Sequence, residues 1–155
     1  MNSQKITVSV IGGHDINDEV EELAHNVGFI IGKMELVLVC GGLSGVMEAA
    51  ARGAKEAGGL TIGLLPGKDK ADANPYIDIA LPTTIGYARN AMVAASGDVI
   101  IALPGSFGTS SEISYANVYG RPVIDFGGWD VLGTIKVETL KELEEKLQEL
   151  IKDLC

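Results

Sequence analysis

Residue types that form disulfides and bind transition metals are scarce in this 155-residue sequence. Its two cysteines, Cys40 and Cys155, are far apart, so they form neither a CxxC pair nor a disulfide framework. Its two histidines, His14 and His25, are isolated from one another and from the cysteines. We therefore predict that the protein has no disulfide network and no metal site.

Long apolar runs and clusters of basic residues are also missing. Apolar residues make up 46% of the chain, but no stretch approaches the ~20 uncharged residues of a membrane helix. The amino terminus has no basic segment followed by an apolar one, as a secretory signal would. Acidic residues outnumber basic ones by 21 to 12, giving a net charge of −9. We expect a cytoplasmic protein with no membrane or nucleic-acid partner.

Short runs rich in valine and isoleucine alternate with longer segments of helical period, which is typical of an α/β fold. The runs are continuously apolar, as in parallel strands that helices cover on both faces. The predicted strands are Ile6–Ile11, Leu36–Val39, Thr61–Leu65, Ile77–Leu81, Val99–Leu103 and Pro122–Asp125. The predicted helices are Asn17–Lys33, Ser44–Ala57, Tyr87–Ala95, Thr109–Tyr119 and Val137–Leu154. We predict one doubly wound, Rossmann-like domain over residues 1–155, with a mainly parallel sheet and irregular loops at Gly67–Tyr76 and Gly127–Gly133.

Three of the predicted strands run directly into a glycine-containing turn that precedes a helix. The turns are Gly12-Gly13-His14-Asp15, Gly41-Gly42-Leu43-Ser44-Gly45 and Pro104-Gly105-Ser106-Phe107-Gly108-Thr109. Carboxyl ends of parallel strands lie at one edge, so the turns should meet beside a middle strand Ile6–Ile11, flanked by Leu36–Val39 and Val99–Leu103. Glycine lets the backbone approach an anion, and helix N-termini supply free N–H groups. The three turns together thus predict a phosphate-binding crevice, whereas any one turn taken alone favours a simple tight connection.

Three motifs stand out around these turns. Gly41–Glu48 reads GGLSGVME, Tyr87–Asn90 reads YARN and Leu103–Glu112 reads LPGSFGTSSE. With these motifs the chain resembles the LOG-like family, which includes cytokinin-activating phosphoribohydrolases, molybdenum cofactor carrier proteins and many members mislabelled as lysine decarboxylases. The resemblance runs from about Ile6 to about Asp125, and the stretches GGLSGVMEAAARGAKEAGG, ANPYIDIALPT and GYARN are most similar to the short carrier-protein branch. It implies an AMP-like nucleotide or a molybdopterin-type ligand.

In the phosphoribohydrolases of this family the third motif reads PGGxGTxxE, and its glutamate is catalytic together with an arginine of the preceding helix. The resemblance therefore implies that Glu112 and Arg89 are the catalytic residues of such an enzyme. Two departures disfavour hydrolase activity: Ser106 replaces the second glycine, and Asn90 follows Arg89 where the hydrolases usually have lysine. The Cβ atom at Ser106 is expected to reshape or narrow the phosphate turn.

Both candidate catalytic residues also have a structural explanation. Thr109-x-x-Glu112 matches a capping box, in which the threonine caps a helix and the glutamate bonds back to the cap N–H. The alternative is a carboxylate beside the phosphate turn that stabilises an oxocarbenium-like ribose or activates water. For Arg89 the alternatives are a surface salt bridge and a guanidinium that holds phosphate oxygens in two directions.

Further residues in and beside the turns are candidates for ligand binding. They are Gly12, Gly13, His14, Gly41, Gly42, Ser44, Gly45, Met47, Asn90, Pro104, Gly105, Ser106, Phe107, Gly108 and Thr109. Asn90 could reach a base or a ribose hydroxyl, or lie on the helix surface. Met47 could line a flat ring or belong to the core. His14 is expected to face the crevice, while Asp15 or Asn17 could cap the following helix.

Two functions fit these residues. The first is binding of a phosphate-bearing nucleotide or pterin without chemistry, and the alternative is a phosphoribohydrolase that cleaves the N-glycosidic bond of a nucleoside 5′-monophosphate. A lysine decarboxylase is disfavoured, because the chain is short and no lysine follows a strand where a Schiff base would form. An NAD-dependent dehydrogenase is disfavoured because the GxGxxG spacing is missing. The weakly charged helices Tyr87–Ala95 and Thr109–Tyr119 predict a homo-oligomer, either a dimer or a tetramer.

Overall fold

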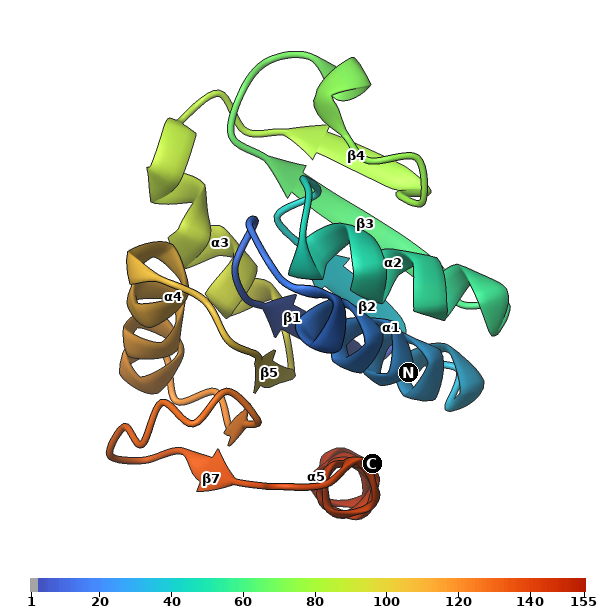
Figure 1. Ribbon diagram of the computed structural model, residues 1–155, viewed down its shortest axis with the longest axis vertical. Coiled ribbons are helices and arrows are strands. Elements are labelled where there is room, and N and C mark those ends of the chain that lie inside the picture. The colour runs from blue at the N-terminus through green and yellow to red at the C-terminus, as the bar shows by residue number, and fades with distance from the viewer. Residues whose placement is uncertain (1–2) are drawn as a thin grey trace.

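The computed structural model describes residues 3–155, and within them seven strands form one parallel sheet (Figure 1). The strands are β1 (Thr7–Ile11), β2 (Val37–Cys40), β3 (Leu60–Leu65), β4 (Ile79–Pro82), β5 (Val99–Ala102), β6 (Val123–Asp125) and β7 (Ile135–Lys136). Their order is β4-β3-β2-β1-β5-β6-β7. Val8 of β1 pairs with Leu38 on one side and Val99 on the other, which confirms the predicted middle strand.

Helices cover both faces of the sheet, as the continuous apolar runs predict. They are α1 (Asp18–Lys33), α2 (Val46–Glu56), α3 (Arg89–Ser96), α4 (Phe107–Val118) and α5 (Leu140–Leu154). One core cluster joins α1, α2 and α5 to the sheet, and a second joins α3 and α4 to its other face (Figure 1). Alternate residues of β1 therefore divide between the clusters, with Val8 and Val10 in the first and Ile11 in the second. No helix within residues 3–155 is long and apolar enough to cross a membrane.

Strand β7 and the start of α3 differ from the sequence prediction. Strand β7 follows the irregular segment Gly127–Gly133 and was not expected, because Ile135 and Lys136 alone give no periodic signal. The predicted helix Tyr87–Ala95 begins as a 3-10 turn, Gly86–Ala88, and becomes α-helical only at Arg89. This break places Arg89 at the first residue of α3, at the carboxyl edge of the sheet.

The capping box considered as an alternative at Thr109 is wrong. Helix α4 already begins at Phe107, after Ser106 with an extended backbone, so Thr109 lies inside the first turn and is buried. Its side chain packs beside Gly105, where a Cβ atom would overlap the Thr109 hydroxyl oxygen. Glu112 therefore has no capping role. At α1 the open choice of cap is settled: Asn17 accepts a 2.9 Å hydrogen bond from the Val20 N–H.

Candidate functional site

The three glycine turns meet at the carboxyl edge of the sheet, joined by main-chain hydrogen bonds. The Gly13 N–H donates to the Pro104 carbonyl at 2.8 Å, and the Val46 N–H donates to the Gly13 carbonyl at 2.9 Å. The Ser44 hydroxyl also donates to the His14 carbonyl at 3.4 Å. The first turn therefore holds the other two against itself, as the sheet order β2-β1-β5 requires.

A cavity of about 620 Å³ opens between these turns. The predicted site residues that line it are Gly12, Gly13, His14, Gly41, Ser44, Met47, Arg89, Asn90, Ser106, Phe107, Gly108, Thr109 and Glu112. Four predicted residues belong to the turns but do not line the cavity: Gly42, Gly45, Pro104 and Gly105. Four lining residues were missed: Val10, Ile11, Leu43 and Tyr87. Val10 and Ile11 end the strand before the first turn and Tyr87 is two residues from Arg89, so adjacency to predicted residues was the available signal.

Gly45 and Gly108 differ in how much room the fold leaves for a Cβ atom. Gly45 has a φ of 71°, and a Cβ atom there would overlap the backbone of Gly13 and His14. At Gly108 the nearest atom to an added Cβ is the Asn90 Nδ2, at 3.5 Å, an ordinary contact. Packing within the chain therefore requires glycine at Gly45 but not at Gly108, where the missing side chain leaves room in the cavity wall.

The first turn of α4 lines this cavity, and within residues 3–155 the N–H groups of Phe107, Gly108 and Thr109 have no acceptor. The Ser106 side chain makes no capping hydrogen bond, and the first intrahelical donor is the Ser110 N–H, 3.0 Å from the Ser106 carbonyl. Gly108 and Thr109, in the uncapped turn, line the cavity. Uncapped N–H groups and the positive end of the helix dipole together attract an anion. Ser106 has a φ of −131°, so the serine fits this turn without backbone strain.

Arg89 supplies a buried positive charge. Its side chain is only 7% exposed, so the surface salt bridge considered for it is wrong. The Nε atom donates to the Leu64 carbonyl at 2.9 Å, and Nη1 donates to the Asn90 side-chain oxygen. Burial lowers the pKa of Arg89, an effect that the nearby Glu112 partly reverses, and an arginine stays cationic at neutral pH. A Cβ atom at Gly41 would lie 2.8 Å from Nη2, so the second turn leaves space for the guanidinium.

Glu112 is a buried carboxyl group in the same cavity. It is 8% exposed and lines the cavity, and among residues 3–155 its carboxyl group forms no hydrogen bond or ion pair. Burial raises the pKa of Glu112 to about 8, although the charge of Arg89 opposes the shift. Glu112 is therefore mostly neutral at pH 7, and Arg89 is left as the dominant charge of the cavity.

Two aromatic residues stand at the rim of the cavity. Tyr87 is 88% exposed and Phe107 is 90% exposed, and both line the cavity together with Met47 and Leu43. Flat aromatic faces and a thioether suit a planar ring. The cavity thus combines an anion-attracting floor with an apolar rim.

A family model described as the SLOG cluster4 family matches residues 5–154 of the chain. The chain belongs to the SLOG cluster4 family. Two solved structures share its fold over nearly the whole chain. The molybdenum cofactor binding protein from Rippkaea orientalis is 33% identical, covers 99% of each chain and has a TM-score of 0.86. The Moco carrier protein from Chlamydomonas reinhardtii is 29% identical, covers 97% of this chain and 99% of its own, and has a TM-score of 0.87.

The chain is also similar in sequence to two further proteins. An uncharacterized protein of Archaeoglobus fulgidus is 42% identical over 116 residues, which is 75% of this chain and 76% of that protein. The cytokinin riboside 5′-monophosphate phosphoribohydrolase of Rhodococcoides fascians is 29% identical over 114 residues, 66% of this chain and 57% of the enzyme. The predicted resemblance to LOG-like and molybdenum cofactor carrier proteins is therefore confirmed, and the enzyme is the more distant relative.

Proposed function

We propose that the protein binds a phosphate-bearing pterin of the molybdopterin type, or a nucleotide, and carries it without chemical change. The observation that carries this proposal is the uncapped amino end of α4, which opens into one cavity with the buried Arg89. Because Glu112 is mostly neutral at pH 7, it does not repel a phosphate there. The likeness to two proteins named for binding or carrying the molybdenum cofactor supports the pterin as the first choice.

The walls of the cavity support a ligand with both a phosphate and a flat ring. The phosphate would lie against the N–H groups of Gly108 and Thr109, near Arg89, and the ring against Tyr87 and Phe107. A volume of about 620 Å³ lies within the usual range for small-molecule sites. When bound, a molybdopterin-type ligand would supply the metal chemistry, and the residues of this chain would only hold and shield it.

The decisive experiment is to denature the purified protein and identify any released small molecule by mass spectrometry. We expect a compound with a phosphate and a pterin or purine ring. Calorimetry of the ligand-free protein should then show binding of AMP or 6-hydroxymethylpterin phosphate, with weaker binding of adenosine. Equal affinity for AMP and adenosine would contradict phosphate recognition, and no binding of any of the three would contradict the proposal as a whole.

A second function, nucleoside 5′-monophosphate phosphoribohydrolase, is favoured by one observation. Glu112 keeps its proton near neutral pH beside Arg89, and a protonated carboxyl group can protonate a leaving base while water adds to the ribose C1′. Release of ribose 5-phosphate from AMP by the wild type, lost by at least ~100-fold in Glu112→Gln, would establish this activity. No release from any nucleoside monophosphate would leave the carrier function.

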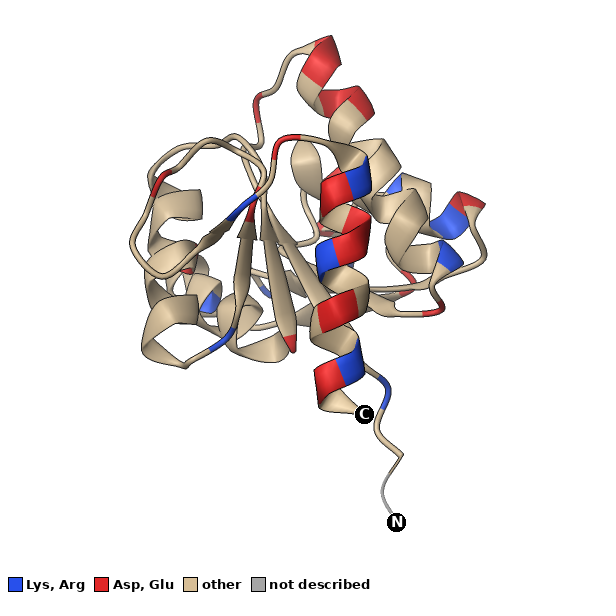
Figure 2. Cartoon of the chain, turned by 90° about the horizontal axis from the view of Figure 1, so that it is seen from below, with Lys and Arg blue, Asp and Glu red and all other residues tan. Residues whose placement is uncertain are grey.

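We also propose that copies of the chain associate through the outer face of α3 and α4. Met92, Tyr115, Val118 and Tyr119 are exposed there, and the two charged residues of these helices, Arg89 and Glu112, are both buried. In Figure 2, α3 and α4 on the left are mostly tan, whereas red and blue bands alternate along α5. Light scattering should give a dimer or tetramer for the wild type.

A charged residue at Val118 tests this interface. Val118→Asp should shift the protein toward the monomer, because an interface would bury an unpaired charge. Leu154→Asp is the matched control, since Leu154 is an exposed apolar residue at the end of α5. A monomeric wild type, or equal behaviour of both variants, would contradict the proposed interface.

A further inference from the structure

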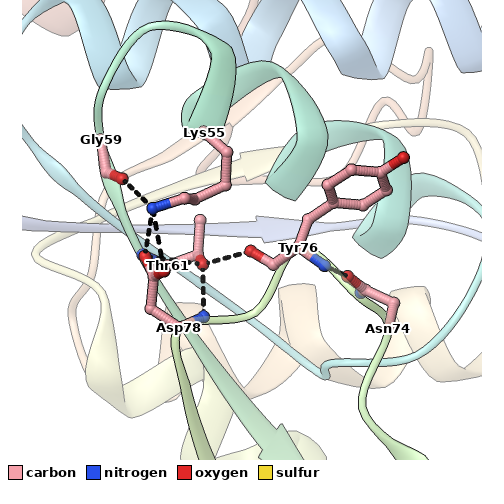
Figure 3. Close-up of polar contacts among 6 residues, drawn as sticks. All are labelled: Lys55, Gly59, Thr61, Asn74, Tyr76 and Asp78. Carbon is pink, nitrogen blue, oxygen red and sulfur yellow. Dashed lines mark hydrogen bonds and ion pairs between the residues drawn. The ribbon is translucent and has the colours of Figure 1, made fainter.

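The loop between β3 and β4, residues 66–78, is anchored at its far end by a polar network (Figure 3). The Asp78 carboxylate accepts hydrogen bonds from the Thr61 N–H at 3.0 Å and from Lys55 Nζ at 2.9 Å. The Thr61 hydroxyl donates to the Tyr76 carbonyl at 2.6 Å. Lys55 also forms an ion pair with Asp78 at 2.8 Å, and the pKa of Asp78 is lowered by these partners against the effect of burial. The loop therefore leaves β3 and returns to β4 along a fixed path.

Asn74 connects this loop to the second glycine turn. Its backbone N–H donates to the Gly42 carbonyl at 2.9 Å, and its side-chain Nδ2 donates to the Leu43 carbonyl at 2.8 Å. Its side-chain oxygen accepts from the Tyr76 N–H at 3.0 Å, a contact drawn in Figure 3. One side of the amide must donate and the other must accept, so these partners fix its orientation. Asn74 is buried but does not line the cavity.

The two bonds to the turn also determine where its N–H groups point. A trans peptide is planar, with its carbonyl and the following N–H on opposite sides. Because the Gly42 and Leu43 carbonyls face Asn74, the Leu43 and Ser44 N–H groups point away from it. Within residues 3–155, no acceptor receives either N–H, whereas the Gly42 N–H donates to the Cys40 sulfur at 3.4 Å.

The side away from Asn74 is the side of the cavity. Asn74 reaches the turn from the loop that follows β3, whereas the cavity walls that follow β1 and β5 lie on the far side of β2. The remaining wall, with Tyr87, Arg89 and Asn90, comes from the segment after β4. Leu43 and Ser44 both line the cavity. Two unpaired N–H groups thus face the space that the uncapped end of α4 also faces.

We infer that Asn74 is a positioning residue, which orients the second glycine turn so that the Leu43 and Ser44 N–H groups bind the ligand phosphate. The inference rests on the proposed function, and it assigns a ligand-binding task to a residue that never touches the ligand. It also divides phosphate recognition between two elements, the amino end of α4 and the turn after β2. Arg89 lies beside Gly41 and lines the same cavity.

The test compares Asn74→Ala and Asn74→Asp with Thr61→Val. Aspartate can still accept from the Tyr76 N–H but has no donor for the Leu43 carbonyl, so it separates the two contacts of the side chain. Thr61→Val cuts the far anchor of the loop and leaves the turn contacts in place. We expect both Asn74 variants to bind AMP about tenfold more weakly, with adenosine binding unchanged. Thr61→Val should lower the unfolding temperature without changing the affinity for either probe.

A role in stability alone would weaken AMP and adenosine binding equally, or leave both unchanged, and either result would overturn the inference. Amide hydrogen exchange provides a readout that needs no ligand. Loss of the Asn74 contacts should speed exchange at the Val46 N–H, which the second turn holds against Gly13, but not at the Gly13 N–H. Unchanged exchange at the Val46 N–H in Asn74→Ala would overturn the inference. If the wild type bound neither AMP nor adenosine, that result alone would contradict only the proposed function, and the exchange measurement would still test the role of Asn74.

Discussion

The two helix layers differ in how they use charge. In the layer of α1, α2 and α5, charged side chains face solvent and form ion pairs such as Arg52 with Glu21 and Lys146 with Glu149. In the layer of α3 and α4, the two charged residues are Arg89 and Glu112, both buried beside the cavity. Exposed ion pairs add little to stability, so the first layer mainly provides a solvated surface. Charge in the second layer is placed where a ligand would meet it.

The largest expected loss of stability is in the layer of α1, α2 and α5, where α1 and α2 pack closely. A Cβ atom at Gly28 of α1 would overlap the Ala50 carbonyl oxygen of α2. Gly28→Ala should therefore destabilise the protein by about 3 kcal/mol or more, because two helix backbones must separate. Urea denaturation measures the loss. A change below about 1 kcal/mol would show that α1 and α2 pack less tightly than the structure indicates.

The next largest effect is the pH dependence of stability that Glu112 causes. Its pKa is raised from 4.5 to about 8, so the folded state holds a proton that the unfolded state has already lost. Wild-type stability should therefore fall as the pH rises from about 4.5 to about 8. Glu112→Gln removes this loss and should be more stable than the wild type at pH 8 by up to about 4 kcal/mol, with the difference disappearing below pH ~4.5.

Glu145→Gln is the matched control, since Glu145 is exposed on α5. Its unfolding free energy should follow that of the wild type at every pH, measured by denaturation from about pH 4 to pH 9. Parallel curves for the wild type and Glu112→Gln would show that the Glu112 carboxyl is solvated, and the contrast between the layers would weaken.

A smaller effect is expected on ligand affinity when the buried cation is removed. Arg89→Ala should weaken AMP binding by about 30-fold, the scale of a lost charge-assisted hydrogen bond. Arg121→Ala is the control, because Arg121 donates to the Ala95 carbonyl and does not line the cavity. Calorimetry on folded protein separates the two variants. Equal affinities would remove Arg89 from the proposed site.

The smallest effect on the fold is expected at Gly108. Gly108→Ala should change stability by less than about 1 kcal/mol, because the added methyl meets only the Asn90 side chain and alanine favours a helix. AMP binding should nevertheless weaken by about tenfold, since the methyl group occupies the cavity wall. This variant contrasts with Gly28→Ala, which removes stability. Unchanged AMP affinity would mean that no ligand atom approaches α4 there.

The parts of the fold that could be predicted from the sequence are the strands that helices bury on both faces of the sheet. Strands β1, β2 and β5 read as continuous Val and Ile runs, and the glycine turns after them predicted the crevice, while the resemblance to the LOG-like family assigned Arg89 and Glu112 to it. The start of α4 could not be predicted, because the Thr109–Glu112 spacing imitates a capping box when the packing against Gly105 is unknown. Asn74 was missed because its contacts depend on the path of an irregular loop, which has no periodicity.

Strands β4 and β7, the two edge strands of the sheet, are both short, which limits the addition of further strands. Strand β7 has two residues, and β4 has four and ends at Pro82, which lacks an N–H donor. A long unpaired margin invites the strand of another molecule to add to it, whereas short margins interrupted by proline resist this. Aggregation by strand addition is therefore disfavoured at both ends of the sheet.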